Sequence, residues 1–173
     1  MSNKFNRRLL PLSLALAAAL GISACSESRN DNAADVKEEQ TEHAKDVADE
    51  KRDVRTTAAE STSDLNKATA EAEHDLTRAA IDANNGGSME EVRETANEGM
   101  EDVAEVRAEG NEENAQAVYD LAVTDAKGKL QIAEELCDSP QVVPQRDECL
   151  KRAKVAYDVA VLDAESAMKK QGG

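Results

Sequence analysis

The stretch Ala83-Asn84-Asn85-Gly86-Gly87-Ser88 (ANNGGS) is the strongest helix-breaking signal in this chain of 173 residues. Glycine and asparagine tolerate the left-handed backbone that ends many helices, and serine is favoured at the start of a helix. Glu91 follows Ser88 by three residues, as in a capping box. The stretch therefore predicts a turn over residues 84–87 between two helices.

Both flanks of this turn have the composition of long helices. Residues 33–83 contain neither Gly nor Pro and are dominated by Ala, Glu, Lys, Asp and Arg, which are mostly good helix formers. Apolar and small residues recur there at spacings of 11, 7, 4 and 3, so they form a narrow stripe, mostly of Ala, along one face. Residues 88–136 carry a second such stripe, and Gly110-Asn111 is expected to kink or end that helix.

The two arms, 33–83 and 88–136, are nearly equal in length. If they fold back on each other, a C-terminal helix lies against the distal half of the second arm. The three helices then form a small bundle. For organisation along the chain we expect long helical arms over residues 33–110 and a helical hairpin over residues 111–173.

The N-terminal end has the layout of a secretory signal peptide over residues 1–24. Lys4, Arg7 and Arg8 form a basic start, and an uncharged run of 14 residues follows from Leu9 to Ile22. A transmembrane helix needs about 20 apolar residues, so this run is too short to remain as a permanent span. The segment is therefore expected to be removed.

Ile22-Ser23-Ala24-Cys25 resembles the lipobox of bacterial lipoproteins, which has a branched aliphatic residue, two small residues and a cysteine. The resemblance implies cleavage before Cys25 and acylation of its thiol with palmitate or similar chains, several of which make a durable anchor. Ser26, where Asp would retain the protein, implies an outer-membrane lipoprotein that faces the periplasm. Residues 25–32 then read as a disordered, lipidated tether. The alternative is an ordinary signal peptide with a chance cysteine.

The C-terminal end contains an internal repeat. The segment Tyr119–Ala126 (YDLAVTDA) matches Tyr157–Ala164 (YDVAVLDA) at an offset of 38 residues. Pro140 and Pro144 lie between the two copies and interrupt any helix there. Residues 111–173 are therefore predicted to form an αα-hairpin.

Two features are expected to hold this hairpin together. Cys137 and Cys149 are an even pair in an exported chain, and we predict that they form a disulfide. A redox site would favour Cys-x-x-Cys, and a zinc site would need two further Cys or His nearby; the sequence offers neither. The apolar residues of the repeat are expected to pack inside the hairpin, so that Asp or Lys at Leu121, Tyr157 or Val159 loosens it.

Composition excludes several classes of function. Removing residues 1–24 takes away three cations, so the formal charge moves from −15 to −18, which makes nucleic acid an improbable partner. Residues 25–173 have no Trp or Phe and only 22 Leu, Ile or Val, too few for a thick core around a pocket. The sequence carries no recognised catalytic or phosphate-binding motif. We therefore expect no enzyme, no cofactor and no small-molecule substrate.

Two sets of polar residues remain as candidates for binding. Residues 90–113 contain ten acids against two arginines, which predicts either a surface for cations or a basic partner, or a plain solvated face. Calcium-loop spacing is missing there, so any cation would be held loosely. His43 and His74 each have a carboxylate within one helical turn, and both are predicted to be exposed surface residues and not metal ligands.

Further resemblances bear on function. The Ala-rich, nearly aromatic-free chain is similar to the murein lipoprotein class of envelope spacers, although it continues past Lys169-Lys170 to Gly173. Residues 137–157 resemble small proteobacterial envelope proteins with paired cysteines, and the 11-residue period resembles late-embryogenesis-abundant stress proteins. We predict a non-catalytic, lipid-anchored structural spacer or scaffold that acts through helical contacts with itself or another envelope protein. The alternative is a partly disordered, stress-linked shielding or cation-binding periplasmic protein.

Overall fold

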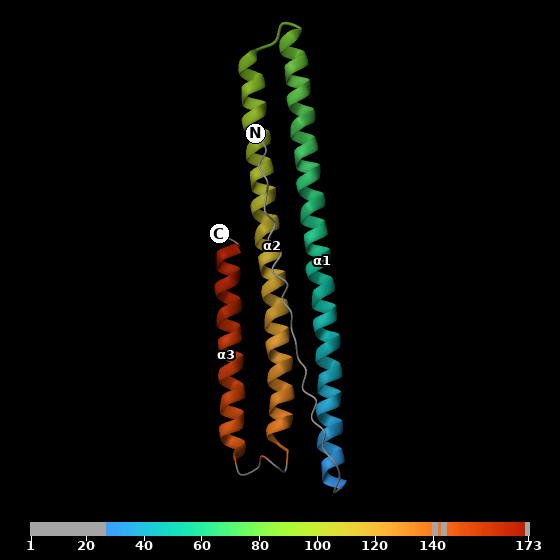
Figure 1. The fold of residues 1–173 in the computed structure, drawn as a ribbon. Coiled ribbons are helices and arrows are strands. Elements are labelled where there is room, and N and C mark those ends of the chain that lie inside the picture. Colours follow the sequence, from blue (N-terminus) through green and yellow to red (C-terminus); the bar gives the residue numbers. More distant parts are fainter. Residues whose placement is uncertain (1–26, 140–141, 143–144, 172–173) are drawn as a thin grey trace, which may run out of the picture.

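The computed structural model describes residues 27–139, 142 and 145–171. They form three α-helices, α1 (Glu27–Asn84), α2 (Met89–Cys137) and α3 (Arg146–Gln171), and this part of the chain contains no strand. Figure 1 shows α1 and α2 as long antiparallel neighbours, with α3 beside the half of α2 that lies farther from their connection. The predicted all-α fold is confirmed, while the predicted signal peptide (residues 1–24) and Cys25 lie outside the described residues.

The turn between α1 and α2 is built by its glycines. Gly86 has φ of +105°, in the region that side chains rarely adopt. Its amide donates to the Ala83 carbonyl oxygen (3.2 Å), and the Gly87 amide donates to that of Asp82 (2.9 Å), which together form a Schellman motif. Ser88 then caps α2, because its hydroxyl accepts from the amide of Glu90 (3.1 Å), one residue before the predicted partner.

Three glycines of α2 fix how closely and in which register α1 lies against it. A Cβ built on any of them would meet a residue of α1 at a distance too short for packing. The pairs are Gly99 with Ala72 (2.8 Å to Cβ), Gly110 with Ser61 (2.9 Å to Cβ) and Gly128 with His43 (2.1 Å to Nδ1). The residue numbers of each pair, 72 and 99, 61 and 110, 43 and 128, add to 171. One antiparallel register therefore runs along the whole pair.

The predicted break at Gly110 is wrong, because α2 is continuous through it. Gly110 is buried opposite Ser61, and this close approach offsets the loss of helix propensity of about 1 kcal/mol that a glycine brings. As a result, residues 33–110 and 111–173 are not separated by any interruption, and α2 belongs to both proposed units.

The predicted flexible tether over residues 25–32 overlaps the first turns of α1, which begins at Glu27. Adding residues to an existing helix costs little compared with starting one. Asn32 has a further contact that favours order: its side-chain amide donates to the Glu135 carbonyl oxygen of α2 at 3.0 Å.

The three helices form a flat row and not the expected three-helix bundle. Figure 1 shows α2 between α1 and α3, and the packing contacts are those of α1 with α2 and of α2 with α3. On α2, Gly128 faces α1, whereas Ala126 is buried two residues earlier, about 200° around the helix. The two neighbours of α2 therefore lie on opposite faces of it, and neither α1 nor α3 completes a bundle with the other.

The expected packing inside the α2–α3 hairpin holds for only part of the repeat. Val159 is 51% exposed and lies on the side of α3 away from α2. Leu121 follows Gly110 by 11 residues, three turns, so it shares the face that meets α1. Tyr157 is half-buried. The predicted role of Leu121 and Val159 in holding the hairpin together is thus wrong, because the repeat carries two faces and only one of them joins α2 to α3.

The buried interior is thin and made of small side chains. Among the described residues, the buried apolar ones are Ala115, Ala126, Cys137 and Ala164. The three on α2 are spaced by 11 residues, three helical turns, and so form one line that ends at the disulfide to α3. Close approach of backbones, rather than interlocking of large apolar side chains, therefore holds the rod together.

Candidate functional site

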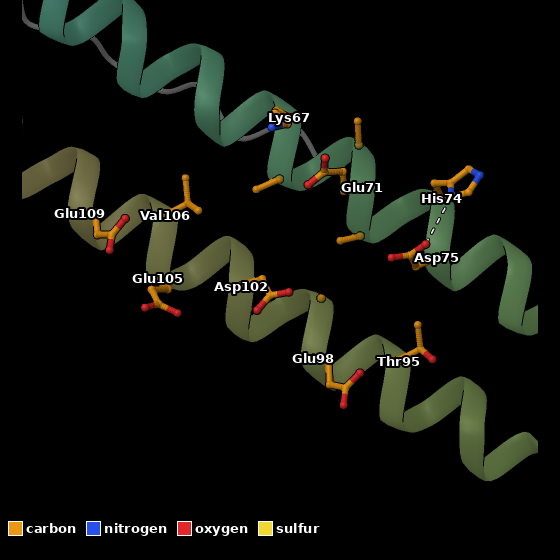
Figure 2. A pocket seen from close by; sticks show the side chains of 14 residues that line it. Lys67, Glu71, His74, Asp75, Thr95, Glu98, Asp102, Glu105, Val106 and Glu109 are labelled. Carbon is orange, nitrogen blue, oxygen red and sulfur yellow. Dashed lines mark hydrogen bonds and ion pairs between the residues drawn. The ribbon is translucent and has the colours of Figure 1, made fainter.

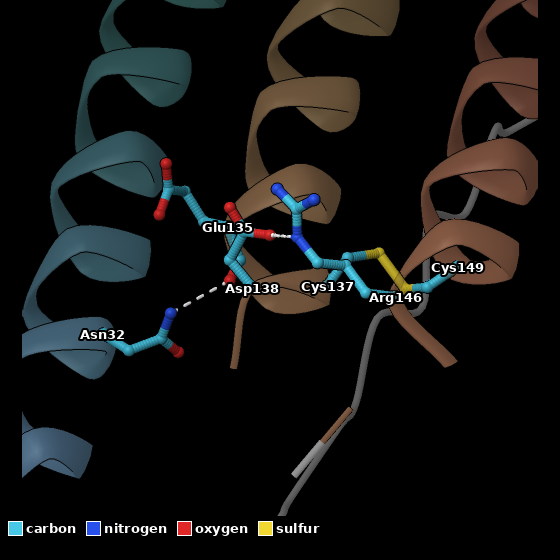
Figure 3. Close-up of polar contacts among 6 residues, drawn as sticks. All are labelled: Asn32, Glu135, Cys137, Asp138, Arg146 and Cys149. Atoms are coloured by element: carbon cyan, nitrogen blue, oxygen red, sulfur yellow. Dashed lines mark hydrogen bonds and ion pairs between the residues drawn. A yellow bond between two sulfur atoms is a disulfide. The ribbon is translucent and has the colours of Figure 1, made fainter. Parts of the chain in front are cut away.

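The end of the rod nearest the N-terminus of α1 collects the strongest cross-links of the fold. Cys137 at the end of α2 and Cys149 near the start of α3 form the predicted disulfide, with Cα atoms 5.7 Å apart and a separation of 12 positions in sequence. Figure 3 shows this bond beside the contact of Asn32 in α1 with Glu135 in α2 and the contact of Arg146 in α3 with Asp138. In the chain-entropy model, closing a loop of this size stabilises the fold by about 3 kcal/mol.

An ion pair spans the same loop. The Arg146 guanidinium, at the first position of α3, donates through Nε to the Asp138 carboxylate that follows α2 (Figure 3). This hydrogen bond is the main reason that the pKa of Asp138 lies below its usual range; desolvation of the carboxylate opposes it, and the attraction of the two charges adds a smaller lowering. The negative charge of Asp138 lies at the C-terminus of α2, and the positive charge of Arg146 lies at the N-terminus of α3. Each is the unfavourable end of that helix dipole, so the pairing of the two charges offsets both unfavourable interactions.

The base of the rod, which is the end nearest the N-terminus of α1, is therefore cross-linked across all three helices. The Asn32 amide ties α1 to α2, and the disulfide and ion pair tie α2 to α3 (Figure 3). Cys25, the predicted lipidation site, lies outside the described residues, two positions before α1 begins. A lipid on Cys25 would consequently join the chain at its most cross-linked end. In the described part of the chain, no helix is both long enough and apolar enough to cross a bilayer.

An acidic groove lies between α1 and α2 in the half of the rod nearer their turn. It has a volume of about 800 Å³, and the closely packed pair Ala72 and Gly99 is part of its lining. Six carboxylates line it: Glu71, Asp75, Glu98, Asp102, Glu105 and Glu109. Figure 2 shows that these side chains spread along the groove and do not converge on one point.

The acids of residues 90–113 form an exposed face of α2. All ten are solvent-accessible, and Glu90 pairs with Arg93 at 3.3 Å. Within the described residues, no three His, Cys, Asp or Glu side chains come together in an arrangement that could hold a metal ion. The structure therefore presents this segment as a solvated surface with high negative charge density.

His43 is not the exposed residue that the sequence predicted. Its side chain is only 16% exposed, because the imidazole lies in the gap left by Gly128 of α2. Nε2 is 3.3 Å from Asp125, whose other oxygen lies 2.5 Å from Lys129 Nζ, while the buried Nδ1 has no hydrogen-bond partner. His74, by contrast, is exposed as predicted, beside Asp75.

Sequence reasoning missed the apolar face on the outer side of α3. Val155, Val159 and Leu162 are 54%, 51% and 62% exposed. Their spacing of four and three residues is a helical stripe, and it differs in phase from the half-buried Tyr157 and Ala160 that face α2. The helical spacing of these three residues is visible in the sequence. The prediction from sequence alone, however, places the apolar residues of both faces of the repeat inside the α2–α3 hairpin.

Comparisons of this chain with protein-family models, with curated proteins and with solved structures find no significant match. The geometry itself defines the class, which is an all-α antiparallel rod with a disulfide-linked third helix beside it.

Proposed function

We propose that this chain is a lipid-anchored outer-membrane protein that faces the periplasm and acts as a non-catalytic scaffold through its helices. The observation that carries the proposal is the pairing of α1 and α2 in one register along their whole length. A helix of 58 residues spans about 85 Å, and it is paired with a second helix of 49 residues. Such a pair is a stiff element that offers long surfaces for contact.

The anchor is supported by position as well as by the lipobox-like Ile22-Ser23-Ala24-Cys25. A lipid at Cys25 would act next to the end of the rod where the disulfide and the Asn32 contact limit fraying. Force or constraint applied at the membrane would then pass directly into α1 and α2.

A labelling experiment tests the anchor. The full chain is expressed in a bacterial host with two membranes and grown with an alkyne analogue of palmitate. We expect label on the wild-type chain in the outer-membrane fraction and none on Cys25→Ala. The matched control is the Cys137→Ala/Cys149→Ala double variant, which keeps Cys25 and should label fully. Label that persists in Cys25→Ala would contradict the proposal.

Circular dichroism separates the scaffold from the shielding alternative. A scaffold should be fully helical in dilute buffer, whereas a shielding protein should gain most of its helix only when a crowding cosolvent is added. Helix content that rises steeply with the cosolvent would therefore argue for the shield.

A further inference from the structure

We propose that the outer face of α3 binds the same face of α3 in a second copy of this chain, with the two helices antiparallel. This inference rests on the scaffold function proposed above and names the partner of one of its surfaces. The outer face consists of Val155, Val159 and Leu162, which form a single stripe of half-exposed side chains. A shallow groove of about 630 Å³ lies along it, between Val155, Val159 and the flanking Lys151 and Arg152.

The internal repeat indicates that this face is made for another helix. The offset of 38 residues relates Val155, Val159 and Leu162 to Ala117, Leu121 and Thr124 of α2. Leu121 lies on the face of α2 that α1 covers, three turns from Gly110. The stripe on α2 is thus covered by α1. The equivalent stripe on α3 is not covered by any helix of the same chain.

The charges of α3 select the partner and its direction. They occur in blocks along the helix: acids at Asp147 and Glu148, bases at Lys151, Arg152 and Lys154, acids at Asp158, Asp163 and Glu165, and bases at Lys169 and Lys170. In a parallel pair of α3 helices, each block would meet a block of the same sign. In an antiparallel pair centred between residues 158 and 159, the first acids meet the last bases.

In this antiparallel pair, Lys151 lies beside Glu165 of the second copy, on one flank of the stripe. Val155 lies opposite Leu162 of the second copy. Asp158 stays close to its own counterpart, which is an unfavourable charge contact. The sequence of α3 is therefore complementary to itself in the reversed direction. A second copy would cover the apolar stripe and pair its charge blocks with blocks of opposite sign.

Membrane anchoring strengthens the contact between the two α3 helices, which involves only a few apolar side chains of each. Chains confined to one surface meet at a high effective concentration, which raises the population of a weak pair without any new contact. Because α3 runs parallel to α1, an antiparallel pair of α3 helices places the N-termini of the two α1 helices at opposite ends. Both lipids can then enter the same membrane when the paired rods lie along it.

Cysteine cross-linking of the full chain in its host membrane tests the pairing. Val159→Cys lies next to the proposed two-fold axis, and mild oxidation should give a disulfide-linked homodimer, with the linked peptide identified by mass spectrometry. Lys151→Cys is the matched control on the same face. Its own copy lies about 22 Å away along the helix in an antiparallel pair, so it should not cross-link.

The outcomes separate the alternatives. No dimer from Val159→Cys, a dimer from both variants, or a cross-link only to a different protein would each overturn the antiparallel homodimer. Lys151→Glu, added to Val159→Cys, should lower the yield roughly three- to tenfold, and Glu165→Lys in the same chain should restore it. Failure of the anchor is distinguished by the palmitate label: label without cross-link refutes the pairing alone, and cross-link without label refutes the anchor alone.

Discussion

Removing matched segments from α1 and α2 should shorten the rod without disturbing its register. Because paired residue numbers add to 171, deletion of residues 62–72 from α1 matches deletion of residues 99–109 from α2. Eleven residues are close to three turns, so both stripes keep their phase. At 1.5 Å per residue the double deletion should shorten the rod by about 16 Å.

Deletion of residues 62–72 alone should be far more harmful. All of α1 before the deletion would move three turns along α2, and His43 would then lie against Ala117 in place of Gly128. Overpacking of this kind costs about 1–3 kcal/mol, to which the loss of the Asn32 contact at the base adds. The free energy of unfolding should therefore fall much further in the single deletion than in the matched pair.

Small-angle X-ray scattering measures the maximum dimension, and thermal unfolding followed by circular dichroism measures stability; both use residues 26–173. We expect the matched deletion to shorten the particle and to keep a cooperative transition. If both deletions unfold at the same temperature, or if the matched deletion leaves the length unchanged, the register argued from the three glycines is wrong.

Three further perturbations test other parts of the fold. Gly86→Ala should destabilise the turn by about 1 kcal/mol because its φ of +105° disfavours a side chain, and an unchanged melting temperature would contradict this. Cys149→Ser should lower the free energy of unfolding by about 3 kcal/mol, and reduction of the wild type should match it; a smaller effect of both would mean that the loop is ordered without the bond. The pKa of Asp138 is lowered in the folded state, so the stabilisation from its pair with Arg146 should be complete above about pH 4 and lost as pH falls through the folded pKa below that. Asp138→Asn should remove this acid-dependent loss, and an identical acid unfolding curve would refute the pairing.

Features set by local chemistry could be predicted from the sequence. The turn depends on Gly86 and Gly87 together with a capping serine, and all three are adjacent. The disulfide follows from an even pair of cysteines on either side of two prolines. The same reasoning excluded a thick core, and the buried apolar residues are indeed mostly alanines.

Features set by contact between distant residues could not be predicted. Gly110 resembles a helix breaker until Ser61 is seen against it, and His43 resembles a surface residue until Gly128 supplies a gap for its ring. Whether the stripe that contains Val159 faces α2 or solvent depends on where α2 lies around α3. In each case the missing information was the partner on another helix, which the pattern along one helix does not contain.

The continuity of α2 is the property on which the scaffold depends most, and a distance measurement tests it directly. Spin labels at Met100→Cys and Gln131→Cys lie on exposed positions of α2 on either side of Gly110. Pulsed electron–electron resonance on the anchored full chain should give one narrow distribution centred at about 46 Å, the length of 31 helical residues. A broad distribution, or a clearly shorter distance, would mean that α2 bends or melts at Gly110 and that the chain is not a rigid scaffold.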